Sequence, residues 1–466
     1  MELEYVGEGV AEPVSPSGHY FSSSVLSISN LVVLEFEVPI DGLAAQTMSL
    51  VKNVFLSINP RFSSVMVEDN GKKHWKRVEV KIEDHVSVPT FPSNLSLELY
   101  DKFFDDYISR LAIERFSQDR PLWEVHCFKY PTSNAAGTMI FNIHHALGDG
   151  YSLMSALLSR LQRADYPSLP LTFPSRRRSS KPKSESFMSK LFSSVSSTIS
   201  DLLNRRMDED ELTPIRSGND GIEFQPIAVS TVTFSLYQIK LIKTRLGVGV
   251  TVNDVLTGII FLGTRLYMQE MKKTSCKARG SAVVVLSTRM NVDYTSIQEM
   301  IKPKSKDISW GNRFTLLHIP IPELTDDFSD ALDFVWKAQK LIRTKRNSLA
   351  TYLAAAFLEI LNKVGGPEAV ARYIRSTLKN SSMVMSNMIG PVEQMSLANH
   401  PIKGLYFLVF GSPEGLDVTI VSYMGKVRVA FKMEKGYIDP QKFNSCMETA
   451  YEMILEASAK AQRNTS

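Results

Sequence analysis

Two adjacent histidines stand at the end of an apolar run and precede an aspartate that lies between glycines. The stretch FNIHHALGDG, residues 141–150, carries His144, His145, Gly148, Asp149 and Gly150. A neutral imidazole is well suited to accept a proton near pH 7, so general-base catalysis is the first chemistry that this stretch suggests. The glycines allow a sharp turn that projects one imidazole into a cleft, and the same turn aims Asp149 in another direction.

Two other roles for the histidine pair stay open. Imidazole suits zinc and iron, but adjacent residues of an extended segment point to opposite sides, and the sequence offers no second cluster of His, Cys or carboxylates to complete a metal site. We therefore expect neither a metal nor a bound cofactor. A purely structural role, in which the histidines cap the turn, is the remaining alternative.

Length and composition set limits on the fold and the partners. A chain of 466 residues exceeds what one hydrophobic core usually serves, which predicts two domains. The net charge of +4 is too small to indicate nucleic-acid binding, so we expect no nucleic-acid partner. Cys127, Cys276 and Cys446 are too few for a disulfide framework and favour a reducing compartment.

The elements that must position the histidines follow from periodicity. Residues 31–38 alternate as in a half-buried strand, and residues 43–58 read as a helix packed on it. Strands are predicted over 73–80, 122–129 and 138–143, and apolar residues from 153 to 161 mark one face of a helix. The predicted local order around the histidines is strand, tight turn, helix.

Composition divides the chain into three parts. Residues 1–165 form the first predicted domain, residues 166–218 a linker rich in serine, proline and basic residues, and residues 219–466 the second domain. Strands and helices occur in both outer parts, which predicts two α+β layers side by side. No window is long and apolar enough to predict a helix that spans a bilayer.

The linker contains one amphipathic stretch, residues 186–203, in FMSKLFSSVSSTISDLLNRR. Its apolar positions share one helical face: Phe187, Met188, Leu191, Phe192, Val195, Ile199, Leu202 and Leu203. A basic group precedes it: Arg176, Arg177, Arg178, Lys181 and Lys183. Such a helix either docks on the protein or lies at an anionic membrane surface, and the sequence leaves both interpretations open.

Several motifs together resemble one family. HHALGDG matches the HHxxxDG signature of the bifunctional wax ester synthase/diacylglycerol acyltransferases, particularly the plant branch. The same resemblance extends over nearly the whole chain: PVSPSGHYF (13–21), PLWE (121–124), VNDVL (252–256), GNR in SWGNRF (309–314), SNMIGP (386–391) and VTIVSYMGKVRVAF (418–431). HHxxxDG alone is shared with the wider superfamily of CoA-dependent acyltransferases, but the ordered set is specific.

The resemblance implies roles for residues of the HHxxxDG motif. It makes His145 the general base, while His144 lines or shapes the site. Asp149 and Gly150 become structural, with Asp149 paired to an arginine from the second half of the chain. Arg289, at the end of a predicted strand, is the best positional match, although a surface charge after the strand is the alternative.

Outside that motif the resemblance assigns Asn253 as a donor to the developing oxyanion, with Asp254 supporting the site. The alternative is that Asn253 or Asp254 caps the following helix. The resemblance also places Ser386 and Asn387 near the site, where a turn before Gly390 is the alternative.

A tryptophan-containing stretch is the last part of the implied site. By resemblance, Pro121, Leu122 and Trp123 shape the acyl-CoA end of a substrate channel. Core packing is the alternative for a tryptophan in a strand.

The implied protein is a two-domain α+β enzyme of the chloramphenicol-acetyltransferase-like fold, with an active-site tunnel between the domains. It would transfer a long acyl chain from acyl-CoA, as co-substrate, to a fatty alcohol, with diacylglycerol as a second acceptor. Its location would be the cytosolic face of the endoplasmic reticulum membrane, or the plasma membrane. The alternatives are a non-catalytic lipid-binding member and an acyltransferase for small specialised metabolites; FGSPEG (410–415) in place of the DFGWG of that latter family argues against the second.

Overall fold

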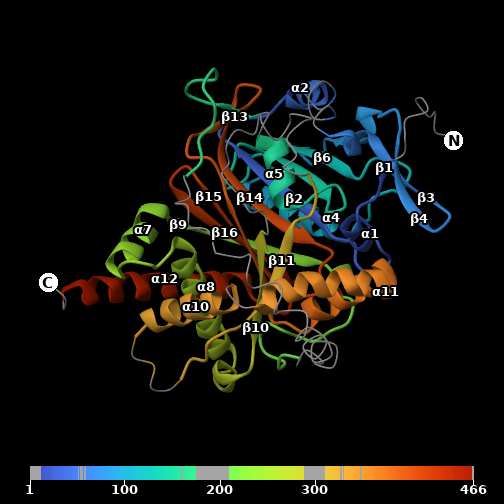
Figure 1. The fold of residues 1–466 in the computed structure, drawn as a ribbon. Coiled ribbons are helices and arrows are strands. Elements are labelled where there is room, and N and C mark those ends of the chain that lie inside the picture. Colours follow the sequence, from blue (N-terminus) through green and yellow to red (C-terminus); the bar gives the residue numbers. More distant parts are fainter. Residues whose placement is uncertain are drawn as a thin grey trace.

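Two large mixed β-sheets form the centre of the molecule, and helices cover them (Figure 1). The structure is a computed structural model that describes residues 12–50, 52, 56, 59–158, 161–174, 209–287, 310–325, 328, 330–346 and 349–463. The predicted linker helix, 186–203, and Arg289 lie outside the described residues. Within those residues, no helix combines the length and the apolar character that crossing a membrane requires.

The first large sheet has seven strands in the order β5-β6-β7-β2-β14-β13-β8. Their bounds are β2 Ser29–Phe36, β5 Val86–Ser87, β6 Trp123–Phe128, β7 Gly137–His144, β8 Gln162–Arg163, β13 Met395–Leu397 and β14 His400–Phe410. Every residue of β7 is buried, which fits the continuous apolar run seen in the sequence. The strand β2 pairs antiparallel with β7, with Ser29 opposite His144.

The second large sheet has six strands in the order β11-β10-β12-β15-β16-β9. Their bounds are β9 Ile227–Ser235, β10 Ser281–Ser287, β11 Phe314–Pro320, β12 Met383–Ile389, β15 Leu416–Tyr423 and β16 Lys426–Glu434. The parallel pairs β10·β12 and β12·β15 lie at its centre, and antiparallel strands flank them. The sheet is therefore mixed, and with the helices that cover it the second half of the chain has the α+β class that the sequence predicts.

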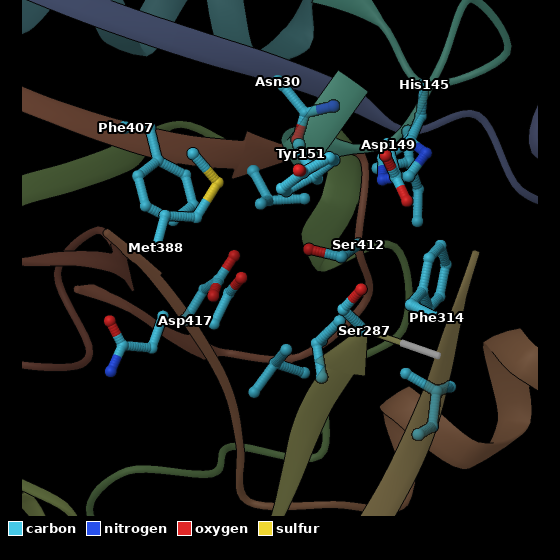
Figure 2. A pocket seen from close by; sticks show the side chains of 18 of the residues that line it. Asn30, His145, Asp149, Tyr151, Ser287, Phe314, Met388, Phe407, Ser412 and Asp417 are labelled. Carbon is cyan, nitrogen blue, oxygen red and sulfur yellow. The ribbon is translucent and has the colours of Figure 1, made fainter. Parts of the chain in front are cut away.

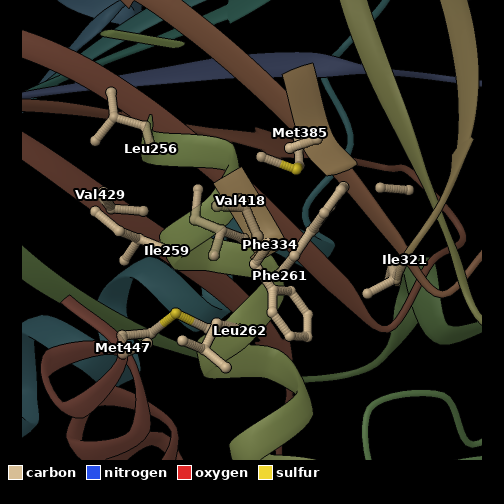
Figure 3. Packing of buried hydrophobic residues seen from close by; sticks show 14 of the residues in the cluster. Leu256, Ile259, Phe261, Leu262, Ile321, Phe334, Met385, Val418, Val429 and Met447 are labelled. Carbon is tan, nitrogen blue, oxygen red and sulfur yellow. The ribbon is translucent and has the colours of Figure 1, made fainter. Parts of the chain in front are cut away.

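Close helix packing supports the second sheet. The central helix α8 (Val252–Met271) packs between α10 (Leu332–Arg346) and α12 (Pro440–Arg463), and α7 (Leu236–Arg245) lies beside it. A Cβ on Gly258 would lie 2.8 Å from the Val335 Cα, so only glycine permits this approach. Figure 3 shows how Phe261, Phe334 and Met447 fill the resulting core.

The remaining elements frame the first sheet and the space between the sheets. A small sheet, β1-β4-β3, lies near the N-terminus: β1 Glu12–Pro13, β3 Ser64–Asp69 and β4 Lys72–Arg77. The helices are α1 Pro16–Phe21, α2 Leu43–Leu50, α4 Leu97–Ile113, α5 Gly150–Leu158 and α11 Leu349–Lys379. The helix α11 contains a break at Gly366, directly before Pro367. The predicted strand, turn and helix around the histidines are present as β7, the turn 145–149 and α5.

The two large sheets do not divide the chain at the linker. The strands β13 and β14 come from residues 395–410, inside the predicted second domain, yet they belong to the first sheet. Residues 405–408 of β14 are all buried, and a strand buried on both faces needs a central place in a sheet. β14 occupies such a central place because it pairs with β2, so a strand from the C-terminal part of the chain completes the N-terminal sheet.

Candidate active site

The histidine turn is held by main-chain hydrogen bonds to the residues that directly precede β6 and β2. The His144 N–H donates to the Leu122 carbonyl at 3.0 Å, and the His145 N–H donates to the Ile28 carbonyl at 2.8 Å. Asp149 then opens α5, because its Oδ1 accepts the Ser152 N–H at 3.0 Å, as an N-cap does. The turn is therefore fixed at both ends, by the sheet and by the helix cap.

A distant segment, residues 310–313, wraps around this turn. The Trp310 indole donates to the Leu147 carbonyl at 2.6 Å, and the Asn312 amide donates to the His145 carbonyl at 3.0 Å. The Arg313 N–H donates to Asp149 Oδ2 at 3.0 Å, and Gly311 makes two hydrogen bonds with Ser152 Oγ. Five hydrogen bonds thus tie the two halves of the chain together at the histidine motif.

His145 packs against two aromatic rings at the wall of a cavity. Its ring centroid is 4.6 Å from that of Phe21 and 5.6 Å from that of Phe314. Burial lowers the pKa of His145 below its ordinary value, and the Asp149 carboxylate opposes this without hydrogen bonding to Nδ1, which has no partner among the described residues. The ring is therefore a neutral base at pH 7. Figure 2 shows His145 and Asp149 side by side at one edge of the cavity.

The cavity lies between the two sheets and has a volume of about 170 Å³. Its wall is mainly apolar, with side chains from β2, β10, β11, β12, β14 and α11. Besides His145 and Asp149, nine polar residues contribute to the wall: Asn30, Tyr151, Ser287, Arg313, Ser386, Asn387, Ser412, Glu414 and Asp417. A Cβ on Gly150 would lie 2.9 Å from the Met388 sulfur, so glycine keeps this part of the wall open. An apolar space with few polar groups suits an aliphatic chain.

His144 turns away from the cavity. Its Nδ1 accepts the Ala146 N–H at 3.1 Å, and its Nε2 lies 3.2 Å from Ser27 Oγ. Because Nδ1 accepts, Nε2 carries the proton and donates to Ser27. Burial lowers the pKa of His144 to about 3. The residue therefore shapes the turn from behind, and it does not line the cavity.

Asp149 accepts a main-chain hydrogen bond from the second half of the chain. The sequence predicts an arginine of the second half as its partner. Arg313 comes from that half and binds the carboxylate through its main-chain N–H. Arg289, the predicted partner, lies outside the described residues, so its pairing stays a prediction.

Asn253 and Asp254 begin α8 in different ways. Thr251 is the N-cap, and it forms a capping box in which Asp254 Oδ2 accepts the Thr251 N–H at 2.8 Å. The Asn253 side-chain oxygen accepts from the Asn387 amide. Ser386 and Asn387 line the cavity, whereas Asn253 lies behind Asn387 and does not. The oxyanion role of Asn253 stays a prediction.

Pro121, Leu122 and Trp123 pack into the protein core and do not line the cavity. Trp123 stacks on His85 with ring centroids 4.1 Å apart, and its indole donates to the Phe62 carbonyl at 2.8 Å. Trp123 therefore has the core position that was the alternative to a place in the substrate channel. The Leu122 carbonyl still reaches the site indirectly, since it holds the His144 N–H.

Several residues of the cavity carried no assigned role in the sequence. Phe21 and Phe314 stand at the ends of PVSPSGHYF and SWGNRF, so these motifs were the signal that marked them. The buried Asn30 lines the cavity, and its amide nitrogen has no hydrogen-bond partner among the residues that the structure covers; nothing in the surrounding apolar strand marks it. No group of three or more His, Cys, Asp or Glu within the described ranges is placed to hold a metal ion.

Comparison with protein families gives two matches. The wax ester synthase/diacylglycerol acyltransferase catalytic domain matches residues 69–256, and the WS/DGAT C-terminal domain matches residues 310–455. Wax ester synthase/diacylglycerol acyltransferase 11 of Arabidopsis thaliana is 30% identical over 474 residues, covering 96% of this chain and 95% of that protein. Member 3 from the same plant is 30% identical and covers 94% of this chain and 92% of that protein.

Solved structures agree on the fold. The wax ester synthase/diacylglycerol acyltransferase from Marinobacter aquaeolei VT8 superposes with a TM-score of 0.61 at 15% identity, over 96% of this chain and 100% of that one. A trichothecene 15-O-acetyltransferase from Fusarium sporotrichioides superposes with a TM-score of 0.56 at 12% identity, over 98% of this chain and 97% of that one. The fold is thus the expected two-domain fold of CoA-dependent acyltransferases. From its sequence relatives, the chain belongs to the wax ester synthase/diacylglycerol acyltransferase family of O-acyltransferases.

Proposed function

We propose that the protein transfers a long acyl chain from acyl-CoA to the hydroxyl of a fatty alcohol, with diacylglycerol as a second acceptor. The observation that carries this proposal is His145, a neutral imidazole at the wall of an apolar cavity between the two sheets. The family membership supplies the reaction class, and the apolar wall fits the aliphatic part of both substrates.

In the proposed reaction His145 accepts the proton of the acceptor hydroxyl as its oxygen attacks the thioester carbonyl. The tetrahedral intermediate then collapses, the carbon–sulfur bond breaks, and the imidazolium returns the proton to the CoA thiolate. The products are an ester and free CoA, and His145 is neutral again. No acyl-enzyme is required. Cys127, Cys276 and Cys446 are all buried outside the cavity wall, which supports direct transfer.

We also propose that the protein works at a membrane surface, on the cytosolic face of the endoplasmic reticulum or at the plasma membrane. Long-chain substrates partition into bilayers, and the basic, amphipathic linker in the sequence is suited to an anionic surface.

The proposed reaction is tested with purified wild type and His145→Ala, given labelled palmitoyl-CoA and either hexadecanol or diacylglycerol with vesicles. We expect ester formation by wild type and a loss of at least about 100-fold in the variant, the size of effect typical for a positioned base. His74→Ala, on the hairpin strand β4, is the control and should retain full activity. A folded wild type that forms no ester with either acceptor would favour the non-catalytic lipid-binding alternative.

A further inference from the structure

Four polar side chains form a buried cluster on the loop between β14 and β15 and on the two strands that follow, and three of them, Ser412, Glu414 and Asp417, line the cavity. Ser412, Glu414, Asp417 and Lys432 are exposed by 4%, 2%, 1% and 5%. Lys432 Nζ donates to Ser412 Oγ at 2.6 Å and to Glu414 Oε1 at 3.4 Å, and it lies 3.8 Å from Asp417 Oδ2. Asp417 and Lys432 stand directly opposite each other on β15 and β16.

This cluster has unused hydrogen-bonding capacity. Glu414 Oε2 and both carboxylate oxygens of Asp417 are buried without a hydrogen-bond partner in the part of the chain that the structure describes. Two carboxylates share one ammonium group, and burial raises the pKa of Asp417, with Glu414 adding to the rise and Lys432 opposing it. A buried carboxylate without partners is destabilising, so these oxygens indicate a place where a ligand supplies donors.

The rest of the cavity identifies what kind of ligand this is. Ser412, Glu414 and Asp417 line the same cavity as His145, whose wall is otherwise largely apolar. Figure 2 shows Asp417 directed into the space near Met388 and Ser412, on a different part of the wall from His145. A molecule that touches both regions has a reacting group at one point and a hydrogen-bond donor at another, with an apolar stretch between them.

We propose that Ser412, Glu414, Asp417 and Lys432 form a binding subsite for a second hydroxyl group, carried on the aliphatic chain of a substrate away from its reacting end. The proposal rests on the acyl transfer proposed above and names the substrate class within it. The hydroxyl donates to a carboxylate oxygen that an unsubstituted chain leaves unpaired. A site built around such a contact discriminates strongly against the analogue that lacks the hydroxyl.

The chain that bears this hydroxyl has two sources, the acyl acceptor or the acyl donor. The first experimental arm compares dodecan-1-ol with dodecane-1,12-diol, both with lauroyl-CoA. The second compares lauroyl-CoA with 12-hydroxylauroyl-CoA, both with dodecan-1-ol. In whichever arm carries the hydroxyl on the chain that the subsite binds, we expect the kcat/KM of wild type to be at least about 10-fold higher for the hydroxylated substrate. This exceeds the twofold gain that a diol would show merely because it has two equivalent hydroxyls.

Two substitutions test the carboxylate itself. Asp417→Leu should abolish the preference and increase the use of the unsubstituted chain, while Glu414 remains as the partner of Lys432. Asp417→Asn keeps the size and one acceptor oxygen, so it should retain a smaller preference. Asp333→Asn changes an exposed carboxylate on α10 and should behave as wild type. The same proteins are heated with dodecane-1,12-diol or dodecan-1-ol, because a bound ligand raises the melting temperature independently of turnover.

The results separate the subsite from the reaction. Ester formation with no preference, or a preference that survives in Asp417→Leu, would overturn the subsite and leave the reaction standing. If no substrate pair gives ester but the diol raises the melting temperature of wild type and not of Asp417→Leu, the subsite stands and the reaction fails. Neither ester nor a shift with the diol would overturn both.

Discussion

Asp149 affects His145 through its charge and through the turn, and not through a hydrogen bond to the imidazole ring. Asp149 gives its two oxygens to the main-chain N–H groups of Ser152 and Arg313, while its charge still raises the proton affinity of His145. Burial outweighs this, and the net pKa of His145 lies below its ordinary value. Asp149 therefore tunes the base through charge and positions it through the turn.

The acid limb of the pH profile tests this arrangement. Protonated His145 cannot accept a proton, so kcat/KM should fall as the pH drops through the pKa of the free enzyme, with a midpoint below about 6.5. Asp149→Asn removes the charge that favours the imidazolium, so the midpoint should move to still lower pH. Steady-state rates from pH 4.5 to 8 measure both. A midpoint that rises in Asp149→Asn would contradict the role given to its charge.

At the scale of elements, the 310–313 segment decides how the turn is held. Gly311 has a φ of +124°, a backbone conformation that L side chains rarely adopt, and a Cβ there would have nothing within 4 Å. Gly311 can therefore make its two hydrogen bonds to Ser152 only because glycine tolerates this φ, and not because a larger side chain would clash.

Gly311→Ala should therefore cost about 1 to 3 kcal/mol through backbone strain and also displace the segment from the turn. We expect a lower melting temperature together with a lower kcat/KM, measured well below the melting transition. Gly436→Ala is the matched control, because Gly436 also has positive φ and open space but lies in the turn between β16 and α12. The control should lose stability and keep its activity. Equal activity of the two variants would show that the segment does not position the turn.

Local patterns predicted most elements, while contacts between distant parts of the chain escaped them. The apolar run before His144 and the glycines after it were sufficient for the strand, turn and helix. Nothing in the sequence pairs residue 149 with residue 313, because a main-chain donor leaves no mark on residue type. Asp417 is hidden for a related reason. In LDVTIVSY it occupies a position that reads as solvent-facing, but the sheet buries it beside Lys432.

At the scale of the whole molecule, both halves of the chain contribute strands to the first sheet, and residues of both sheets line the cavity. Since β14 pairs with β2, the wall of the cavity contains residues from both ends of the chain, Asn30 and Phe407 among them. The strands β13 and β14 thus join the part before the predicted division at 166–218 to the part after it, and the division itself stays a prediction. If the linker binds a membrane, it therefore attaches both halves of the protein as one unit, because they already share the first sheet.

Flotation with anionic vesicles tests the membrane proposal on the whole protein. Replacing the five basic residues 176, 177, 178, 181 and 183 by glutamine should weaken binding at least about 10-fold, because each basic group near an anionic surface contributes about 1 kcal/mol. Added salt should also weaken the binding of wild type to anionic vesicles, because salt screens the attraction between charges. A control variant carries the same change at five exposed positions of α7 and α10: Lys240, Lys243, Lys337, Lys340 and Arg346. Unchanged flotation of the linker variant would remove the linker from the proposal.

The hydrogen bonds around the histidine turn also bear on how this sequence can change over time. Leu147 and His145 offer carbonyl oxygens, Arg313 offers its N–H, and Gly311 offers both. Every amino acid supplies the same carbonyl, and every one except proline supplies the same N–H. These main-chain bonds therefore place no demand on the residue type at position 313, while Leu147 is constrained by its burial in the core and not by its hydrogen bond. The side chains of Trp310, Asn312, Asp149 and Ser152 supply the other half of each bond, so the constraint on residue type falls on these four positions.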